Sequence, residues 1–588
     1  MDTKQYLLFG LLLWLYYPLA ESRCPKACTC ALKLGKKTVH CSGGALSLIP
    51  VSEMDTNTHE LVVTAPPGGP PNNITIGRIF LKQTNLEVVR ITRSNVPAIG
   101  DRTFWPGRRM RVLDLSHNAI TFLSESDFVG LKNLQELYLS DNLIFASPSA
   151  PFRHLISLRK LSLARNKLQT LVPRLFYLLS HLEELDLSGN ALRNIEYENL
   201  QDVKALKVLK LANCRLSHLH PIIYQQLPLL EELDLKDNLI ASLAPAEFRH
   251  LSKLSILHLD GNLLKSITDG TFHDHKLSIL GLSRNIISVL SDHAFINSSV
   301  TFLDLSRNRL DYVLRDTFQP LSHALEVLNI SFNDLGNQAF SSIVSPLESL
   351  KILEASNLMV SYLSPDTFSH NYQIKRLNLS GNSIVSPHPS SLSHLEQLED
   401  LDLSFNAMPL LSVEFLQGLD NITSLKVLRL HGNPFDCSDC FIEPFIQWLN
   451  ASQIVEQNCS TDECLTCRFP PEMNGHLLTR VSPDDVWCSG GVYERQFLAY
   501  TSQIGMIVAV SIIVIIVCII LIIIIIYRRH IAHYYTGEEE RGWKGMYENP
   551  ALAPSGGVHY RDDKPTFISS SDKVDENIEE FRSSSIMR

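Results

Sequence analysis

Cysteine thiols are the groups whose spacing in this sequence most clearly predicts chemistry. Ten of the twelve cysteines lie in two clusters, and we expect all ten to form disulfides in an oxidising compartment. A zinc site at Cys437-Ser-Asp-Cys440 is the alternative, but no second ligand pair follows at suitable spacing, so we predict no metal and no cofactor. The clustered cysteines are Cys24, Cys28, Cys30 and Cys41, then Cys437, Cys440, Cys459, Cys464, Cys467 and Cys488.

Asparagines in Asn-x-Ser/Thr sequons predict a second chemistry, the attachment of N-linked glycans. One sequon is weak evidence, but several in a chain that also carries export signals indicate a glycoprotein. The predicted sites are Asn73, Asn297, Asn329, Asn378, Asn421 and Asn450, with a poorer one at Asn458.

Two apolar segments predict export and a membrane anchor. The apolar stretch Tyr6–Tyr17 indicates a secretory signal peptide over residues 1–20. The run Ile504–Ile526 is unbroken, and at about 1.5 Å per residue it reaches roughly 34 Å, enough to cross a bilayer core. Arg528 and Arg529 follow at once, which favours a cytoplasmic C-terminus. We therefore expect a single-pass type I protein of the plasma membrane.

A repeated sequence motif, Leu-x-x-Leu-x-Leu-x-x-Asn-x-Leu, predicts the secondary structure that positions these groups. For most of the chain its asparagine returns every 23 to 25 residues, as at Asn118 and Asn142. The paired leucines, such as Leu113 and Leu115, alternate with polar residues and therefore point inward from a short strand. This period is typical of a leucine-rich repeat solenoid, so we predict an α/β, right-handed horseshoe with a parallel sheet on its concave face.

Other residues of the repeat have structural interpretations. Cys214 occupies the asparagine position of its repeat, where cysteine is also accepted, so we expect a buried cysteine and not a reactive thiol. An aromatic residue follows the asparagine in most repeats and should fill the convex side of the core. These aromatics are Phe128, Phe152, Phe176, Phe248, Phe272, Phe295, Phe318, Phe368 and Phe415.

The residue between the two paired leucines should point from the concave face, and it is our candidate for ligand contact. Across the repeats this position leans acidic, which favours a partner presenting lysine and arginine. A solvated face without a partner is the alternative. Asn329 and Asn378 share this position, so we expect a protein ligand on the first nine repeats. The candidate ligand-binding residues are Asp114, Tyr138, Asp186, Lys210, Asp234 and His258.

The repeats and cysteine clusters together resemble extracellular leucine-rich repeat receptors with cysteine-rich flanks, over roughly residues 24–488. Fourteen readable repeats on a single span look like the Tartan and Capricious adhesion receptors of arthropods. The resemblance implies a role in cell-surface recognition. It also implies C-terminal disulfide pairs, although six cysteines allow fifteen arrangements. The implied pairs are Cys437 with Cys467, Cys440 with Cys488, and Cys459 with Cys464.

The expected layout follows the order of these signals. The signal peptide (1–20) precedes an N-terminal cap (21–60), about 14 clear repeats with degenerate ones at the start (61–433), and a C-terminal cap (434–488). A stalk (489–503), the span (504–526) and a disordered cytoplasmic tail (527–588) complete the chain. In the tail, Tyr547-Glu-Asn549 is similar to a phosphotyrosine ligand of SH2 adaptors, and an unmodified linker tyrosine is the alternative.

The residue pattern favours binding over catalysis. No phosphate-binding glycine loop, metal-binding helix or nucleophile elbow is visible, so we predict that the protein is not an enzyme. The net charge of −10 and the lack of a long basic run disfavour nucleic acid as a partner. We predict a recognition or adhesion receptor for an extracellular or cell-surface protein, homophilic binding included. A co-receptor or decoy that binds a soluble ligand or modulates another receptor is the alternative.

Overall fold

The computed structural model describes residues 24–438, 440–456 and 464–481, all within the first of two compact units, Met1–Cys488. The predicted signal peptide, stalk, span, tail and Tyr547 lie outside these residues. Among the described residues, no helix has the length and apolar character to cross a membrane.

The described residues form the predicted solenoid, built on one main sheet of eighteen strands. The first two strands pair antiparallel, and every later neighbour is parallel, in chain order from β2 to β20. The strands are β1 (Thr29–Lys33), β2 (Lys36–Cys41), β3 (Thr58–Thr64), β4 (Val88–Thr92), β5 (Val112–Asp114), β6 (Glu136–Tyr138), β7 (Lys160–Ser162), β8 (Glu184–Asp186), β9 (Val208–Lys210), β10 (Glu232–Asp234), β11 (Ile256–His258), β13 (Lys276–Gly281), β15 (Ser299–Asp304), β16 (Val327–Asn329), β17 (Ile352–Glu354), β18 (Arg376–Asn378), β19 (Asp400–Asp402) and β20 (Val427–Arg429).

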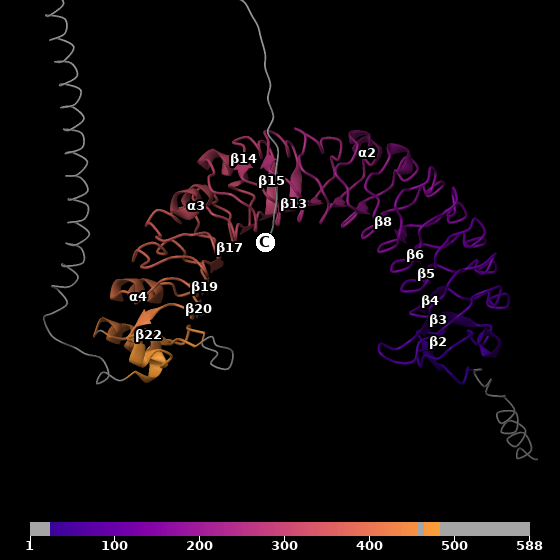
Figure 1. Cartoon of the computed structure of the whole chain (residues 1–588), viewed down its shortest axis with the longest axis horizontal. Coiled ribbons are helices and arrows are strands. Elements are labelled where there is room, and N and C mark those ends of the chain that lie inside the picture. Colours follow the sequence, from indigo (N-terminus) through magenta and orange to yellow (C-terminus); the bar gives the residue numbers. More distant parts are fainter. Residues whose placement is uncertain (1–23, 439, 457–463, 482–588) are drawn as a thin grey trace, which may run out of the picture. The chain divides into compact units, whose positions relative to one another are not determined.

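The repeats curve into an arc with the strands on the inner, concave side (Figure 1). Most connections on the outer side are turns, so the helical share is smaller than the predicted α/β class suggests. Two small parallel sheets pair β12 (Ser266–Ile267) with β14 (Val289–Leu290), and β21 (Phe435–Asp436) with β22 (Cys467–Phe469). The helices are α2 (Pro221–Gln226), α3 (Gly336–Val344), α4 (Val413–Asp420) and α5 (Glu443–Ala451), with 3-10 turns η1 (Val51–Glu53), η2 (Tyr197–Asn199), η3 (Arg315–Thr317), η4 (Gln319–Leu321), η5 (Cys440–Ile442), η6 (Pro471–Met473) and η7 (Leu478–Arg480).

The helix α4 shows how a connection can form a helix, because it has both a side-chain cap and an apolar face. The Ser412 hydroxyl accepts a hydrogen bond from the Phe415 N–H at 3.2 Å and so caps the start of α4. The same helix buries Phe415, Leu416 and Leu419 against the core. The α/β character of the fold is therefore a local property of particular repeats.

Alternation along each short strand separates the core from the concave face. In β5 and β6 the central residues, Leu113 and Leu137, are fully buried, while the residues on either side are half-buried. Because neighbouring strands pair in register, each strand position forms a continuous row along the sheet.

Aromatic rings fill the convex side of the core, as predicted. Phe272 lies between two neighbours, with ring centroids 6.4 Å from Phe248 and 5.9 Å from Phe295. Phe80 and Phe104, which the sequence pattern had not singled out, are also buried and stack with ring centroids 5.4 Å apart. All of the predicted phenylalanines are buried.

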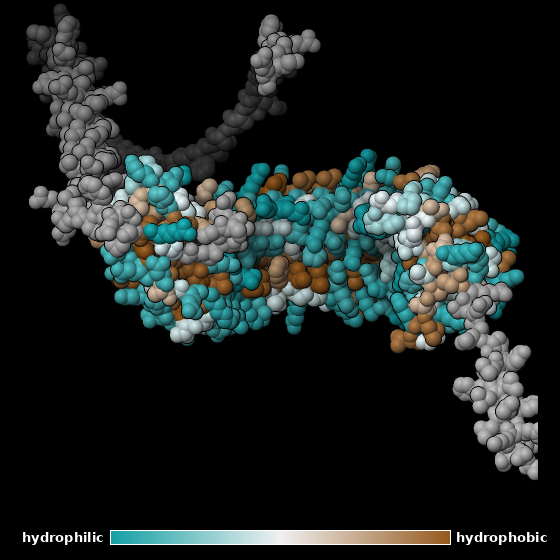
Figure 2. Space-filling view, turned by 90° about the horizontal axis from the view of Figure 1, so that it is seen from below, coloured by the Kyte–Doolittle hydropathy of each residue, from teal (hydrophilic) through white to brown (hydrophobic). Residues whose placement is uncertain are grey.

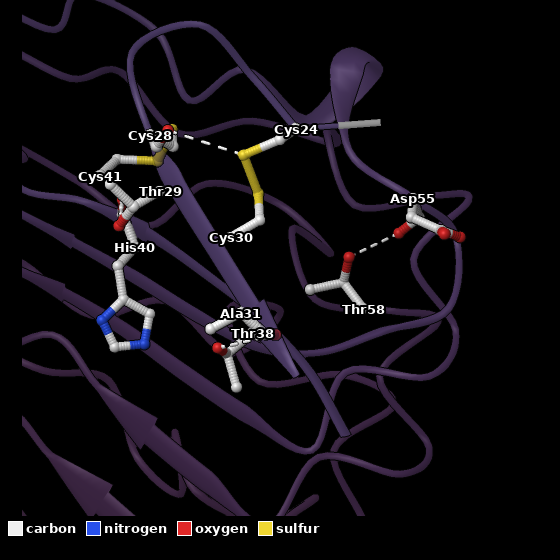
Figure 3. The surroundings of a disulfide bond; sticks show 10 residues. All are labelled: Cys24, Cys28, Thr29, Cys30, Ala31, Thr38, His40, Cys41, Asp55 and Thr58. Carbon is white, nitrogen blue, oxygen red and sulfur yellow. Dashed lines mark hydrogen bonds between the residues drawn. A yellow bond between two sulfur atoms is a disulfide. The ribbon is translucent and has the colours of Figure 1, made fainter. Parts of the chain in front are cut away.

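Disulfide-bonded caps cover the two ends of the solenoid. At the N-terminus, Cys24 pairs with Cys30 and Cys28 with Cys41, around the β1–β2 hairpin (Figure 3). At the C-terminus, Cys437 pairs with Cys467, which is the pair the family resemblance implies. Cys464 is also disulfide-bonded. The remaining implied pairs involve Cys440, whose side chain is not described, and Cys459 and Cys488, which lie outside the described residues.

Candidate ligand-binding face

A ladder of asparagine side chains holds each strand in position. The Asn142 amide donates to the carbonyl oxygens of Leu115 and Leu139, both at 3.0 Å, and its Oδ1 accepts from the Ile120 N–H at 3.0 Å. One side chain therefore satisfies backbone groups of two successive repeats at a tight, buried corner. The same bonds recur at later positions, for example at Asn238.

The two irregular positions of this ladder keep its geometry. Cys214 is fully buried, and its Sγ lies 3.3 Å from the Leu187 carbonyl oxygen, where an asparagine amide would donate. Burial raises the pKa of its thiol to about 11, so the thiol stays protonated at neutral pH. Leu358 fills the other position with a buried aliphatic side chain, and its N–H donates to Asn382 Oδ1 at 2.9 Å.

The structure places all six candidate residues in one row on the concave face. Each is the third residue of a three-residue strand, and register pairing connects Asp114 through Tyr138 and onward to His258. All six are half-buried. We call this the third-position row; it continues through Gly281, Asp304, Asn329, Glu354, Asn378, Asp402 and Arg429.

The aspartates of this row share one local geometry. The Oδ1 atoms of Asp114, Asp186 and Asp234 accept a hydrogen bond from the N–H two residues later, at 2.9, 3.0 and 3.0 Å. This bond holds each carboxylate against the strand end. The other oxygen of Asp186 also accepts from the Ser162 hydroxyl at 3.5 Å. Asp304 and Asp402 repeat the arrangement.

Tyr138 and Lys210 are each held by a neighbouring glutamate. The Tyr138 hydroxyl donates to Glu136 Oε2 at 2.9 Å, and burial together with this acceptor raises the pKa of Tyr138 to about 12. Lys210 Nζ donates to Glu184 Oε1 at 3.2 Å. Burial opposes the charge of Lys210, but Glu184 outweighs it and the pKa is raised. Both side chains are therefore pre-oriented, and Lys210 keeps its charge.

His258 lies over a buried carboxylate. Its Nδ1 is 3.6 Å from Asp260 Oδ2, while Asp260 Oδ1 accepts from the Ser283 N–H at 3.0 Å and from the Ser283 hydroxyl at 2.8 Å. Burial favours the neutral form of Asp260, but the contacts with His258 and Ser283 outweigh it and lower its pKa. The centre of the face therefore keeps a negative charge beside the histidine.

A second row on the concave face was missed by the sequence analysis. The residues two positions before the third-position row also pair in register, and most of them are half-buried; we call them the first-position row. Its middle is apolar, with Ile256, Ile279 and Phe302 on successive strands. The signal was present, because five successive repeats place an apolar residue at a position that is charged in several other repeats.

The predicted glycan sites differ in their surroundings. Asn73, Asn297, Asn421 and Asn450 are exposed, whereas Asn329 and Asn378 are half-buried in the third-position row. The Asn378 amide Nδ2 donates to Glu354 Oε2 at 2.8 Å. Since Nδ2 is the atom to which a glycan would attach, this hydrogen bond competes with modification there.

The described residues contain no group of three or more His, Cys, Asp or Glu side chains arranged to hold a metal ion. The concave face is instead a broad surface of charged, polar and apolar side chains. Such a surface can bind a protein by electrostatic and hydrophobic complementarity.

Comparisons with known proteins agree with this fold. Five segments match the leucine rich repeat family: residues 84–144, 147–192, 204–264, 275–335 and 346–408. Trophoblast glycoprotein of Macaca fascicularis is 26% identical over 159 residues, 26% of this chain and 36% of that protein. Leucine-rich repeat-containing protein 3B of Danio rerio is 30% identical over 146 residues, 25% of this chain and 46% of that protein. The chain thus spans under half the length of these curated relatives.

Two solved structures are similar in fold. A leucine-rich repeat protein of Leptospira interrogans aligns with a TM-score of 0.53 at 20% identity, over 71% of this chain and 94% of that one. A chain of the glycosylated Toll–Spatzle complex of Drosophila aligns with a TM-score of 0.53 at 21% identity, over 74% of this chain and 58% of that one. Identities this low show the shared fold alone.

Proposed function

We propose that this leucine-rich repeat protein is a cell-surface recognition or adhesion receptor, which binds a protein ligand through the concave face of its solenoid. The observation that carries the proposal is the third-position row, which runs in register along the parallel sheet. Its side chains differ from repeat to repeat while the strand geometry stays constant. A rigid support with variable side chains suits recognition and requires no catalytic step.

Three further observations support an extracellular ligand. The paired cysteines of both caps fit an oxidising environment. Four sequons are exposed and can accept glycans. The Drosophila fold neighbour belongs to a Toll–Spatzle complex, which supports a protein ligand on this fold. In the proposal, the predicted signal peptide and span make the protein type I, with the solenoid outside the plasma membrane.

Two aspartates with the same local geometry provide a matched test of where the ligand binds. Asp186 and Asp402 each accept a hydrogen bond from the serine N–H two residues later, but they lie at different ends of the third-position row. We expect Tyr138→Ala and Asp186→Ala to weaken binding in a cell-mixing assay with the full chain. We expect Asp402→Ala to bind normally. Normal binding by the first two variants, with loss in Asp402→Ala, would contradict the proposed position.

The alternative function is a co-receptor or decoy for a soluble ligand. Cells that express the chain without residues 530–588 separate the two, because adhesion by the solenoid does not need the tail. Aggregation of these cells favours adhesion. A secreted factor that co-precipitates with the chain, in the absence of aggregation, favours the co-receptor.

The tail proposal is independent of ligand binding. We propose that phosphorylated Tyr547 binds an SH2-type adaptor, because Tyr547-Glu-Asn549 has the required spacing. Co-precipitation of an adaptor with the phosphorylated chain, and its loss with Tyr547→Phe, would support this. Equal recovery with both forms would exclude Tyr547 as the site.

A further inference from the structure

Five consecutive strands present an apolar surface at the middle of the concave face. The first-position residues of β11, β13, β15, β16 and β17 pair in register and are half-buried. Brown, hydrophobic atoms are visible along the concave side, bordered by teal, hydrophilic atoms (Figure 2). We call these residues the central patch; they are Ile256, Ile279, Phe302, Val327 and Ile352.

The same row is mostly charged in the neighbouring parts of the sheet, with Val208 of β9 as an exception. On the N-terminal side, β6, β7 and β8 place Glu136, Lys160 and Glu184 at the first position. On the C-terminal side, β18 and β19 place Arg376 and Asp400 there. The central patch is therefore a feature of particular repeats and not a requirement of the repeat. The inward-facing leucines already form the core, so folding does not need these five apolar side chains.

Carboxylates that form no direct ion pair border the central patch. Glu232, Asp234, Asp304 and Glu354 form no ion pair within 4.0 Å among the described residues. Between β10 and β17, the first-position and third-position rows contain no lysine or arginine. A binding partner would therefore have to supply the opposite charge.

Carboxylates elsewhere on the concave face do form ion pairs, unlike those around the central patch. Glu184 lies 3.2 Å from both Lys160 and Lys210, and Asp400 lies 2.6 Å from Arg429. These carboxylates are compensated by neighbouring strands. Those around the central patch form no direct ion pair and place negative charge beside apolar side chains.

Gly281, which is buried, interrupts the third-position row next to the central patch. A Cβ atom built on Gly281 would lie 2.3 Å from Asp260 Oδ2, so the buried Asp260 carboxylate occupies the space a side chain would need. The third-position row therefore carries no side chain on β13. Asp260 places a further negative charge at this point.

We infer that the central patch binds a segment of an extracellular protein that presents aliphatic or aromatic side chains next to lysine or arginine. The apolar side chains would pack on Ile279 and Phe302, and the cations would pair with the surrounding carboxylates. This inference rests on the proposed function and specifies where and how the ligand is recognised. A second copy of the chain fits less well, because two such patches would oppose acid to acid.

A random dodecapeptide library displayed on phage tests the inference. The target is the full chain in nanodiscs of zwitterionic lipid, after depletion of the library on the Phe302→Ser variant. We expect the recovered peptides to combine aliphatic or aromatic residues with lysine or arginine. We expect their capture to fall by at least about tenfold on Phe302→Ser, as for the loss of one interfacial aromatic anchor. Glu232→Lys should weaken capture as well, because it removes a carboxylate that would pair with a cation of the peptide. Glu232 forms no ion pair within the described residues, so the substitution breaks none.

Matched controls separate local contact from general damage. Val112 occupies the first-position row on β5, outside the central patch, so Val112→Ser should capture the peptides normally. Glu396 is exposed on a connection between strands, so Glu396→Lys controls for the change of charge. Equal losses in the patch variants and these controls would overturn the inference. So would recovered peptides rich in acidic residues, or no enrichment over the depleted library.

The remaining outcomes separate this inference from the proposed function. A dimer of the full chain that Phe302→Ser dissociates in analytical ultracentrifugation would make a second copy the occupant and overturn the inference. Loss of cell binding in Tyr138→Ala but not in Phe302→Ser would leave the proposed function standing and reject the central patch. If peptides bind the patch but no concave variant alters cell binding, the inference holds and the proposed function fails.

Discussion

The asparagine ladder and the third-position row lie within the same repeats but follow opposite rules. Asn142, Asn166 and Asn238 make the same set of hydrogen bonds at each step of the ladder. The third-position row changes at every step, from carboxylate to phenol to ammonium to imidazole. The alternation of a strand separates the two, since only one side faces the core. The interior therefore determines stability, and the concave face is free to specify a partner.

The largest expected effect lies in the core. Phe272→Ala removes a ring that contacts the rings of Phe248 and Phe295 and leaves a cavity. We expect the free energy of unfolding to fall by about 3–5 kcal/mol. Urea unfolding of the full chain in detergent, followed by circular dichroism, measures this loss. A change near zero would mean that the convex aromatic stack does not support the repeats.

Loss of one asparagine of the ladder should give the next-largest fall in the free energy of unfolding. Asn238→Ala leaves the carbonyls of Leu211 and Leu235 and the N–H groups of Cys214 and Leu216 without their partner. We expect a loss of roughly 2–4 kcal/mol, since each buried group left unpaired costs about 1–3 kcal/mol and relaxation recovers part of it. The matched variant is Asn238→Cys, which copies the natural occupant of position 214 and should lose less. Equal losses in both would show that the thiol is no substitute for the amide.

Removal of a cap disulfide should affect one end of the solenoid only. Loss of the Cys28–Cys41 bond by Cys28→Ser and Cys41→Ser should destabilise the N-terminal strands by about 2–5 kcal/mol. Repeats contact mainly their neighbours, so the middle should be protected. Hydrogen exchange measures both regions, with faster exchange expected in β2 and β3 and no change in β11. Faster exchange throughout would show that the solenoid unfolds as one cooperative unit.

The concave face should show the smallest effect on stability. Asp186→Ala loses two half-buried hydrogen bonds, one from the Ser188 N–H at 3.0 Å and one from the Ser162 hydroxyl at 3.5 Å. We expect the free energy of unfolding to change by about 0.5–1 kcal/mol, far less than at Asn238. The same urea titration tests this expectation. A loss as large as that of Asn238→Ala would remove the distinction between interior and face.

The reactivity of the Cys214 thiol tests the burial of the interior without any substitution. Its raised pKa, about 11, keeps the thiol protonated and unreactive at pH 8, whereas an unperturbed thiol would be partly ionised. Alkylation of the native chain with iodoacetamide, followed by peptide mass spectrometry, should leave Cys214 unmodified until urea is added. Rapid labelling in the native state would place the thiol at the surface.

The buried aromatic series shows where prediction from the sequence stopped. The Phe128 to Phe415 series was predicted because a bulky apolar residue recurred at a fixed spacing, but Tyr224 takes the same buried place in a different form. Its hydroxyl donates to Glu247 Oε1 at 3.2 Å, and burial raises its pKa well above the ordinary value. A buried tyrosine needs a hydrogen-bond partner for its hydroxyl, and here a residue of the next repeat provides it. The spacing of residues in the sequence does not reveal that partner.

Leucine spacing by itself determined the solenoid, its inward side and the third-position row, because a strand with one buried face permits a single alternation of side chains. Only the tertiary structure decided which carboxylates are paired and which are not. Glu184 and Glu232 occupy equivalent positions two strands apart, yet Glu184 is flanked by Lys160 and Lys210 while Glu232 forms no ion pair within the described residues. Charge compensation depends on distances between strands far apart in the chain, and these distances are determined by the stacking of the repeats.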